Sequence, residues 1–408
     1  MADIERSFDS ACPTNGDQPS ASGEDIEKLG RKRPAVFKNV FMEIGFCVSV
    51  LASNLISEFL ISGMNVLLPS LVRELHIPPE SQTWPASVFT LVAVIGLMSF
   101  LCIPRDMHAR QGSMDWWGCA CSIPGIFLVV YAITESSHVR GGWASPQIIV
   151  TFVLGILSLA AFVFVESGRA THPLLPASIF APKHTVALFL YLFLAYGCFG
   201  IYLFYASFYI EVVLKVPSFL AALWFAPLAA GGILIALVGG MTLHRLSGTL
   251  LLLLSASGFL VCVLLFAVMP EQPSYWAWVF PAMVCATLGI DISYNVSSIF
   301  ITTNVAKHEQ GLAGACVNGL VFLGIAFFLG WGDLAVAKTA YLGVRASYKT
   351  AFFLGTGCAG VAIVLVVLGI RIDKAKSGLT VDEKESLSNR PLAGESGLQI
   401  GHRMEGRK

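Results

Sequence analysis

Two carboxyl side chains lie in the middle of long apolar runs, where an ionisable group is costly. Glu58 lies in the run 44–71, and Asp291 lies in the run 276–303. An ionisable residue at membrane depth is a candidate functional group by default. A carboxyl group shielded from water can bind and release a proton near neutral pH. Glu58 and Asp291 are therefore our candidates for proton coupling.

Each of these carboxyl groups belongs to a polar stripe on one face of a predicted helix. Spacings of i, i+4, i+8 and i+11 define the first stripe: Asn54, Glu58, Ser62 and Asn65. The second stripe consists of Thr287, Asp291, Tyr294, Asn295, Ser298 and Thr302. A polar stripe in lipid must face protein or water, so we expect a central aqueous cavity. Hydrogen bonds that hold the helices together are the alternative.

An aromatic face in another apolar run is a third candidate. Cys198, Tyr202, Tyr205 and Tyr209 recur at helical spacing within the run 185–210. Aromatic rings with hydroxyl groups suit a cavity wall that binds amphipathic or cationic compounds. Packing against a neighbouring helix explains the same pattern equally well. Asp333, near the end of a later run, is expected at the membrane interface instead.

The elements that must position these residues are ten long apolar runs. Of 408 residues, 55% are hydrophobic and 13% charged, whereas a soluble protein has about 25% charged residues. A helix needs about 20 apolar residues to cross the hydrocarbon core. The predicted spans are 44–71, 84–103, 116–134, 147–165, 185–210, 219–243, 249–268, 276–303, 315–336 and 350–372. The fold class is therefore all-α, a polytopic membrane protein with the lipid bilayer as its solvent.

Several function classes lack any signal in this sequence. The formal net charge is zero, so no nucleic-acid partner is indicated. No phosphate-binding loop, zinc-protease or serine-hydrolase motif occurs, and the ten cysteines form no CxxC pair. We expect no enzyme activity, no cofactor and no bound metal.

The basic residues indicate the orientation of the chain. An even number of spans puts both termini on one side of the membrane. Lysines and arginines are equally frequent in the short loops of both sides, but they also flank the first and last spans, at 31–38 and 371–376. Because such residues are enriched on the cytoplasmic side, both termini are predicted to be cytoplasmic.

Three stretches of this sequence, in order, resemble one family. They are PRD at 104–106 followed by GSMDWWG at 112–118, HPLLP at 172–176, and HEQGLAG at 308–314 with Asn318. Together they resemble the fungal fourteen-span drug:proton antiporters of the major facilitator superfamily. The resemblance implies a major-facilitator-like helical bundle and adds Asn318 to the candidate cavity residues.

The same resemblance implies that the N-terminal half is incomplete. Spans three to six of the family, with their signature loop, have no counterpart, and residues 84–103 resemble the start of span two joined to the end of span six. The expected parts are a disordered cytoplasmic tail (1–43), a two-span remnant of the N-terminal bundle (44–103), two linker spans (104–184), a six-helix C-terminal bundle (185–372) and a second disordered cytoplasmic tail (373–408).

The function that the resemblance implies is proton-coupled export of small amphipathic compounds or drugs. Its sites would be Glu58 and Asp291 for protons, and for the substrate Asn54, Asn65, Tyr202, Tyr205, Tyr209, Tyr294, Asn295 and Asn318. Two alternatives remain open: a truncated, non-transporting membrane protein or assembly partner, and a proton-coupled uptake carrier. With one half incomplete, we expect a dimer or pairing with a full-length relative. The plasma membrane is the expected location, with the vacuolar membrane as the alternative.

Overall fold

The computed structural model describes residues 116–139, 141–168, 175 and 177–374, with short pieces at 68–69, 71–72, 74–75 and 381–382. Of residues 116, 168, 236–244 and 308 it describes the backbone only. Regular structure over the long described ranges is helical throughout. The predicted spans 44–71 and 84–103 lie almost wholly outside the described residues.

The described helices follow one another with short connections. Helices α5 (Trp116–Glu135) and α6 (Pro146–Gly168), the predicted linker spans, come first, followed by the short α7 (Ala177–Phe180). The remaining helices are α8 (Thr185–Phe208), α9 (Ser218–Trp224), α10 (Ala226–Arg245), α11 (Gly248–Ala267), α12 (Phe280–Thr303), α13 (Gln310–Thr339) and α14 (Val344–Gly369). Single π-helical turns extend α8 over Tyr209–Val213 and precede α12 over Tyr275–Val279.

Eight helical segments in the described part of the chain are long and apolar enough to cross a membrane. They coincide with the eight spans predicted from residue 116 onward, which confirms the all-α polytopic class. Helices α13 and α14 begin five and six residues before their predicted starts at 315 and 350. The predicted span 219–243 is divided at Phe225 into α9 and α10. Pro227 explains the division, because it has no N–H to donate to the carbonyl of Leu223 and its ring crowds that carbonyl.

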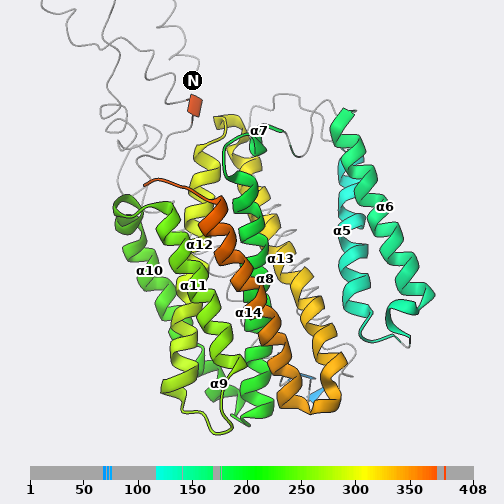
Figure 1. The fold of residues 1–408 in the computed structure, drawn as a ribbon, viewed down its shortest axis with the longest axis vertical. Helices are drawn as coiled ribbons and strands as arrows, with labels where there is room; N and C mark the ends of the chain where they lie inside the picture. The colour runs from blue at the N-terminus through cyan, green and yellow to red at the C-terminus, as the bar shows by residue number, and fades with distance from the viewer. Residues whose placement is uncertain are drawn as a thin grey trace, which may run out of the picture.

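Helix α8 runs through the centre of the bundle, and α11, α12, α13 and α14 all pack against it (Figure 1). Helices α5 and α6 form a separate hairpin beside α13 (Figure 1). The outer face of α6 is apolar and exposed, with Leu157 59% and Phe164 63% accessible. Such a face suits contact with lipid tails.

Small residues let α8 and α13 approach closely. A Cβ on Gly200 would lie 3.0 Å from the Cα of Ile325, and one on Gly324 would meet the backbone carbonyl of Phe193. Membrane helices associate through such close packing, because lipid provides no hydrophobic force between them. Glycines at these positions in both helices therefore permit the close α8–α13 contact.

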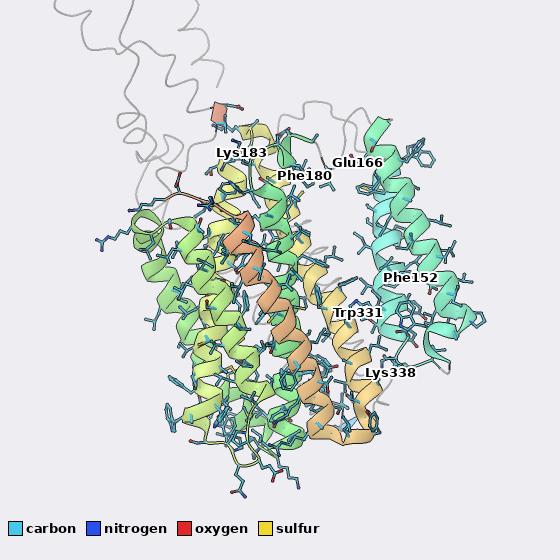
Figure 2. All side chains as sticks on the ribbon, in the orientation of Figure 1. Phe152, Glu166, Phe180, Lys183, Trp331 and Lys338 are labelled. Atoms are coloured by element: carbon cyan, nitrogen blue, oxygen red, sulfur yellow. The ribbon has the colours of Figure 1, made fainter. Side chains whose placement is uncertain are left out.

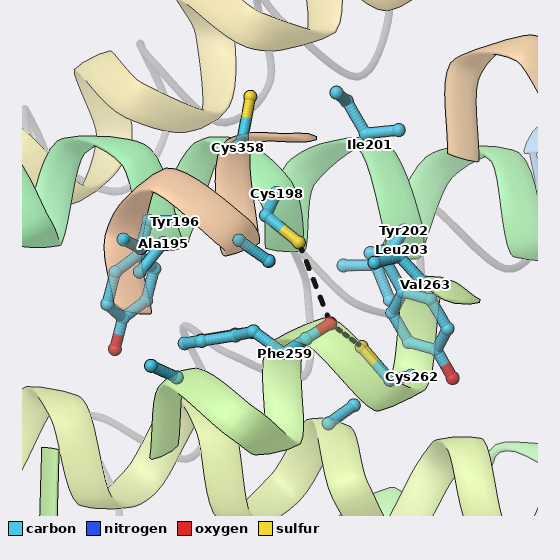
Figure 3. Close-up of a cluster of buried hydrophobic side chains, with 14 of the residues drawn as sticks. Ala195, Tyr196, Cys198, Ile201, Tyr202, Leu203, Phe259, Cys262, Val263 and Cys358 are labelled. Atoms are coloured by element: carbon cyan, nitrogen blue, oxygen red, sulfur yellow. Dashed lines mark hydrogen bonds between the residues drawn. The ribbon is translucent and has the colours of Figure 1, made fainter. Parts of the chain in front are cut away.

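Aromatic rings and cysteines fill the core around α8 and α11. Tyr202 and Phe266 meet edge to face with their centroids 5.5 Å apart. Cys198 and Cys262 both direct their thiols at the carbonyl of Phe259, with Sγ–O distances of 3.8 and 3.1 Å (Figure 3). These cysteines are free thiols packed as small apolar side chains.

Candidate functional site

Helix α12 has one buried face and one polar, accessible face. Its buried face carries Met283, Ser293 and Val296, which lie against the bundle. The opposite side presents Asp291, which is half-buried, and Asn295, which is exposed. The helical spacing predicted from the sequence therefore holds, and α12 brings these two side chains to one surface.

A hydrogen bond joins this surface to α13. The hydroxyl of Tyr294 donates to Oδ1 of Asn318 at 3.1 Å. The amide of Asn318 in turn donates to the carbonyl of Gly314 at 3.2 Å, and the amide of Asn295 donates to the carbonyl of Asp291 at 2.8 Å. We call Asp291, Tyr294, Asn295 and Asn318 the α12–α13 polar face.

The carboxyl group of Asp291 lies beside a pair of glycines on α10. A Cβ on Gly232 would lie 3.4 Å from Oδ2 of Asp291, and one on Gly231 would lie 2.9 Å from Cγ2 of Thr287. The hydroxyl of Thr287 lies 3.2 Å from the carbonyl oxygen of Leu228 on α10 and 3.0 Å from that of Met283 on α12, so the two helices are in direct contact here. The two glycines thus leave room for the carboxyl group at the helix contact.

No other described residue forms an ion pair or a side-chain hydrogen bond with the Asp291 carboxyl group. On the α13 side, a Cβ on Gly311, Gly314 or Gly319 would meet no atom within 4 Å. The polar face therefore borders open space in the described part of the chain. An accessible carboxyl group in such a place can take up a proton or face a cationic ligand.

The three tyrosines of α8 lie inside the bundle, and each hydroxyl meets a different helix. Tyr202 donates to the sulfur of Met283 on α12 at 3.2 Å, and Tyr205 donates to Oδ1 of Asp333 on α13 at 3.4 Å. Tyr209 accepts from Nε of Arg345 on α14 at 3.3 Å. The structure shows these rings packed between helices, which was the alternative to a cavity wall. Their role in binding a substrate stays a prediction.

Glu58, Asn54 and Asn65 lie outside the described residues. Their roles in proton coupling (Glu58) and in the substrate cavity (Asn54, Asn65) stay predictions. Among the residues that the structure describes, no group of three His, Cys, Asp or Glu side chains could hold a metal ion.

Asp333 lies in a polar contact that the sequence did not indicate. Its expected position at the membrane interface stays a prediction. In the structure its side chain is 14% exposed, and its Oδ2 lies 3.3 Å from Nε2 of His138 in the α5–α6 hairpin. The signal in the sequence was an acidic residue within an otherwise apolar helix. Its histidine partner is 195 positions earlier, and no local pattern connects the two.

Comparison with known proteins identifies the family. The model of the Major Facilitator Superfamily matches residues 125–329. The chain is 30% identical over 295 residues to an uncharacterized transporter of Saccharomyces cerevisiae, covering 71% of this chain and 54% of that protein. The aminotriazole resistance protein of the same yeast is 28% identical over 296 residues, covering 70% and 54%. The efflux pump terJ of Aspergillus terreus is 26% identical over 298 residues, covering 70% and 57%.

These alignments span about half the length of each relative. The similarity to transporters agrees with the helices of the described region, which are long and apolar enough to cross a membrane. It also agrees with the family resemblance of the three sequence motifs. The chain belongs to the Major Facilitator Superfamily of membrane transporters.

Proposed function

We propose that this protein is a secondary active transporter that exports small amphipathic compounds in exchange for protons. The observation that carries the proposal is the carboxyl group of Asp291, which is accessible on the α12–α13 polar face and has no ionic partner among the described residues. The names of two relatives, a resistance protein and an efflux pump, support export over uptake.

The polar face suits competition between a proton and a substrate. When Asp291 is ionised, it attracts a cationic compound, and when it is protonated, that attraction is lost. Tyr294 and Asn318 offer a neutral hydrogen-bonding pair beside it, which can orient the polar end of a ligand. Exchange of one occupant for the other would couple the proton gradient to export.

The proposal includes the orientation and the partner of the chain. We place both termini in the cytoplasm and the protein in the plasma membrane. Because the alignments span about half the length of the relatives, a dimer or pairing with a full-length relative would cover the polar face.

The test is ethidium transport by the full chain in proteoliposomes with and without an imposed pH gradient. We expect the gradient to drive ethidium movement. Asp291→Asn should lower the driven rate by about tenfold or more, the factor that a loss of 1.4 kcal/mol produces. Asn318→Ala removes a hydrogen bond but no charge, so it should weaken apparent affinity and retain the dependence on the gradient.

Val163→Ala on α6 is the control, because its side chain is 60% exposed on the lipid-facing side of the hairpin. It should transport like the unaltered protein. If Asp291→Asn keeps full gradient dependence, the proton role of Asp291 is wrong. If the unaltered chain moves no ethidium under either condition, cationic export by this chain is wrong.

A further inference from the structure

A second polar cluster lies away from the α12–α13 polar face, where the linker hairpin meets the bundle. The hairpin and α13 approach at Gly330, whose Cβ would lie 2.8 Å from Oγ1 of Thr134. Trp143, in the turn between α5 and α6, stacks on Trp331 of α13 with ring centroids 6.4 Å apart. Figure 2 shows Trp331 on α13 facing the hairpin. These contacts seat one end of the hairpin on α13.

Asp333 is at the centre of this cluster. Its Oδ2 lies 3.3 Å from Nε2 of His138 and 3.2 Å from Oγ of Ser137, both just after α5. Its Oδ1 accepts from the hydroxyl of Tyr205 on α8 at 3.4 Å. The His138 and Asp333 side chains are only 10% and 14% exposed. Three separate parts of the fold therefore meet at one shielded carboxyl group.

The geometry limits the protonation states that this contact can hold. Nδ1 of His138 lies 2.9 Å from the hydroxyl of Ser137 and 3.2 Å from the carbonyl oxygen of Thr134. As imidazolium, the ring donates from Nδ1 to this carbonyl and from Nε2 toward Oδ2 of Asp333, and the pair has zero net charge. As neutral imidazole with its hydrogen on Nε2, the ring accepts at Nδ1 from Ser137, and the pair with the carboxylate has one negative charge.

Loss of the imidazolium proton is unfavourable in a shielded site. Without it, the carboxylate keeps a negative charge that the histidine no longer balances, and with a second proton on the carboxyl group, the pair carries a net positive charge. The titratable neighbours are Glu135 of α5, Tyr205 of α8 and Tyr348 of α14. Among the described residues, no lysine or arginine forms an ion pair with Asp333. A protonated His138 is therefore the cation that balances this carboxylate in the described part of the chain.

We propose that His138 and Asp333 form a proton-binding site that holds the linker hairpin on the C-terminal bundle. Ser137 and Tyr205 are positioning residues that orient the carboxyl group. The site is separate from Asp291 and depends only on the contact of α5 with α13 and α8. The proposal for this site does not depend on whether the chain exports a compound.

The test is hydrogen–deuterium exchange of the full chain in lipid nanodiscs between about pH 5 and pH 9, a range that brackets the titration of histidine. After correction for intrinsic exchange, protection of residues 136–145 should fall about tenfold or more toward alkaline pH, because the imidazolium proton is lost and the carboxylate loses its balancing charge. His138→Gln and Asp333→Asn should each remove this dependence. The double variant should recover protection relative to either single one, because two amides can form a neutral hydrogen bond.

Arg345→Met is the matched control, because Arg345 forms an ion pair with Glu271 at 2.8 Å elsewhere in the bundle. It should keep the pH dependence of residues 136–145. If protection of residues 136–145 does not change with pH in the unaltered protein, the proposal is overturned. This measurement uses no variant, so its outcome does not depend on whether a variant folds. An unchanged profile in folded Asp333→Asn overturns it equally.

Discussion

At the residue scale, Gly258 determines how closely α11 and α12 approach. A Cβ at this position would lie 2.6 Å from the backbone oxygen of Cys285 and 3.2 Å from the nitrogen of Gly289. The neighbouring Ser255 donates to the carbonyl of Gly289 at 2.6 Å and lies 2.9 Å from the hydroxyl of Tyr191. The close approach thus permits a buried hydrogen-bonded contact that links three helices.

Gly258→Ala should destabilise the protein by about 1–3 kcal/mol, because the added methyl group meets backbone atoms and the two helices must move apart. Thermal unfolding in detergent would measure the change. Gly357→Ala on α14 is the control, because its Cβ meets nothing within 4 Å. There alanine should be neutral or stabilise by up to about 1 kcal/mol. An equal loss of stability in Gly258→Ala and Gly357→Ala would contradict this explanation.

At the element scale, α5 and α6 pair through reciprocal glycines. A Cβ on Gly125 would lie 2.8 Å from the side chain of Leu159, and one on Gly155 would lie 3.0 Å from the backbone nitrogen of Val129. Ser158 strengthens the pair by donating to the carbonyl of Cys121 at 2.7 Å. The hairpin is therefore held by its own contacts, and it meets the bundle mainly through α13.

Gly155→Leu should separate α5 from α6 and raise amide exchange over residues 116–168, because a leucine cannot fit against the α5 backbone. Exchange in α8, α11 and α14 should stay unchanged. Hydrogen–deuterium exchange mass spectrometry would compare these segments. Gly360→Leu is the control, since that position on α14 borders open space. Increased exchange throughout the bundle would show that the hairpin is not a separate unit.

At the scale of the whole molecule, the α12–α13 polar face requires a cover. Asp291, Asn295 and Asn318 cannot face lipid tails without a large free-energy cost. In the described part of the chain, nothing lies within 4 Å of a Cβ at Gly311 or Gly314 beside them. Residues outside the described ranges, or a second chain, would have to shield this face from lipid.

The resemblance to a fourteen-span family predicts an additional coding stretch in the native transcript near codons 95–103. Four spans with their loops would require roughly 100 residues or more. Sequencing full-length native transcripts across codons 95–103 would show directly whether the additional stretch is present. If the transcript joins as written, the prediction of four further spans is wrong, and cross-linking in native membranes would then test for a dimer or a complex with a full-length relative.

The α12–α13 polar face shows which features of the protein were predictable from the sequence. The spacing of Asp291, Tyr294 and Asn295 placed them on one side of α12, because a helix has a fixed period whatever surrounds it. The membrane-spanning helices from residue 116 onward were predictable for a similar reason: the transfer of apolar residues into lipid depends on composition over about 20 positions. These properties are local to a segment, and the sequence by itself determined them.

Contacts between distant segments were decided by the tertiary structure alone. Tyr202, Tyr205 and Tyr209 share a face of α8, yet their hydroxyls meet three different helices. Asp333 pairs with His138 because Gly330 lets the hairpin approach α13 at that point. Lipid tails accept several faces of an apolar helix equally well, so the composition of a helix does not determine which other helix packs against it. Close packing and buried hydrogen bonds select it, and these exist only after the helices have come together.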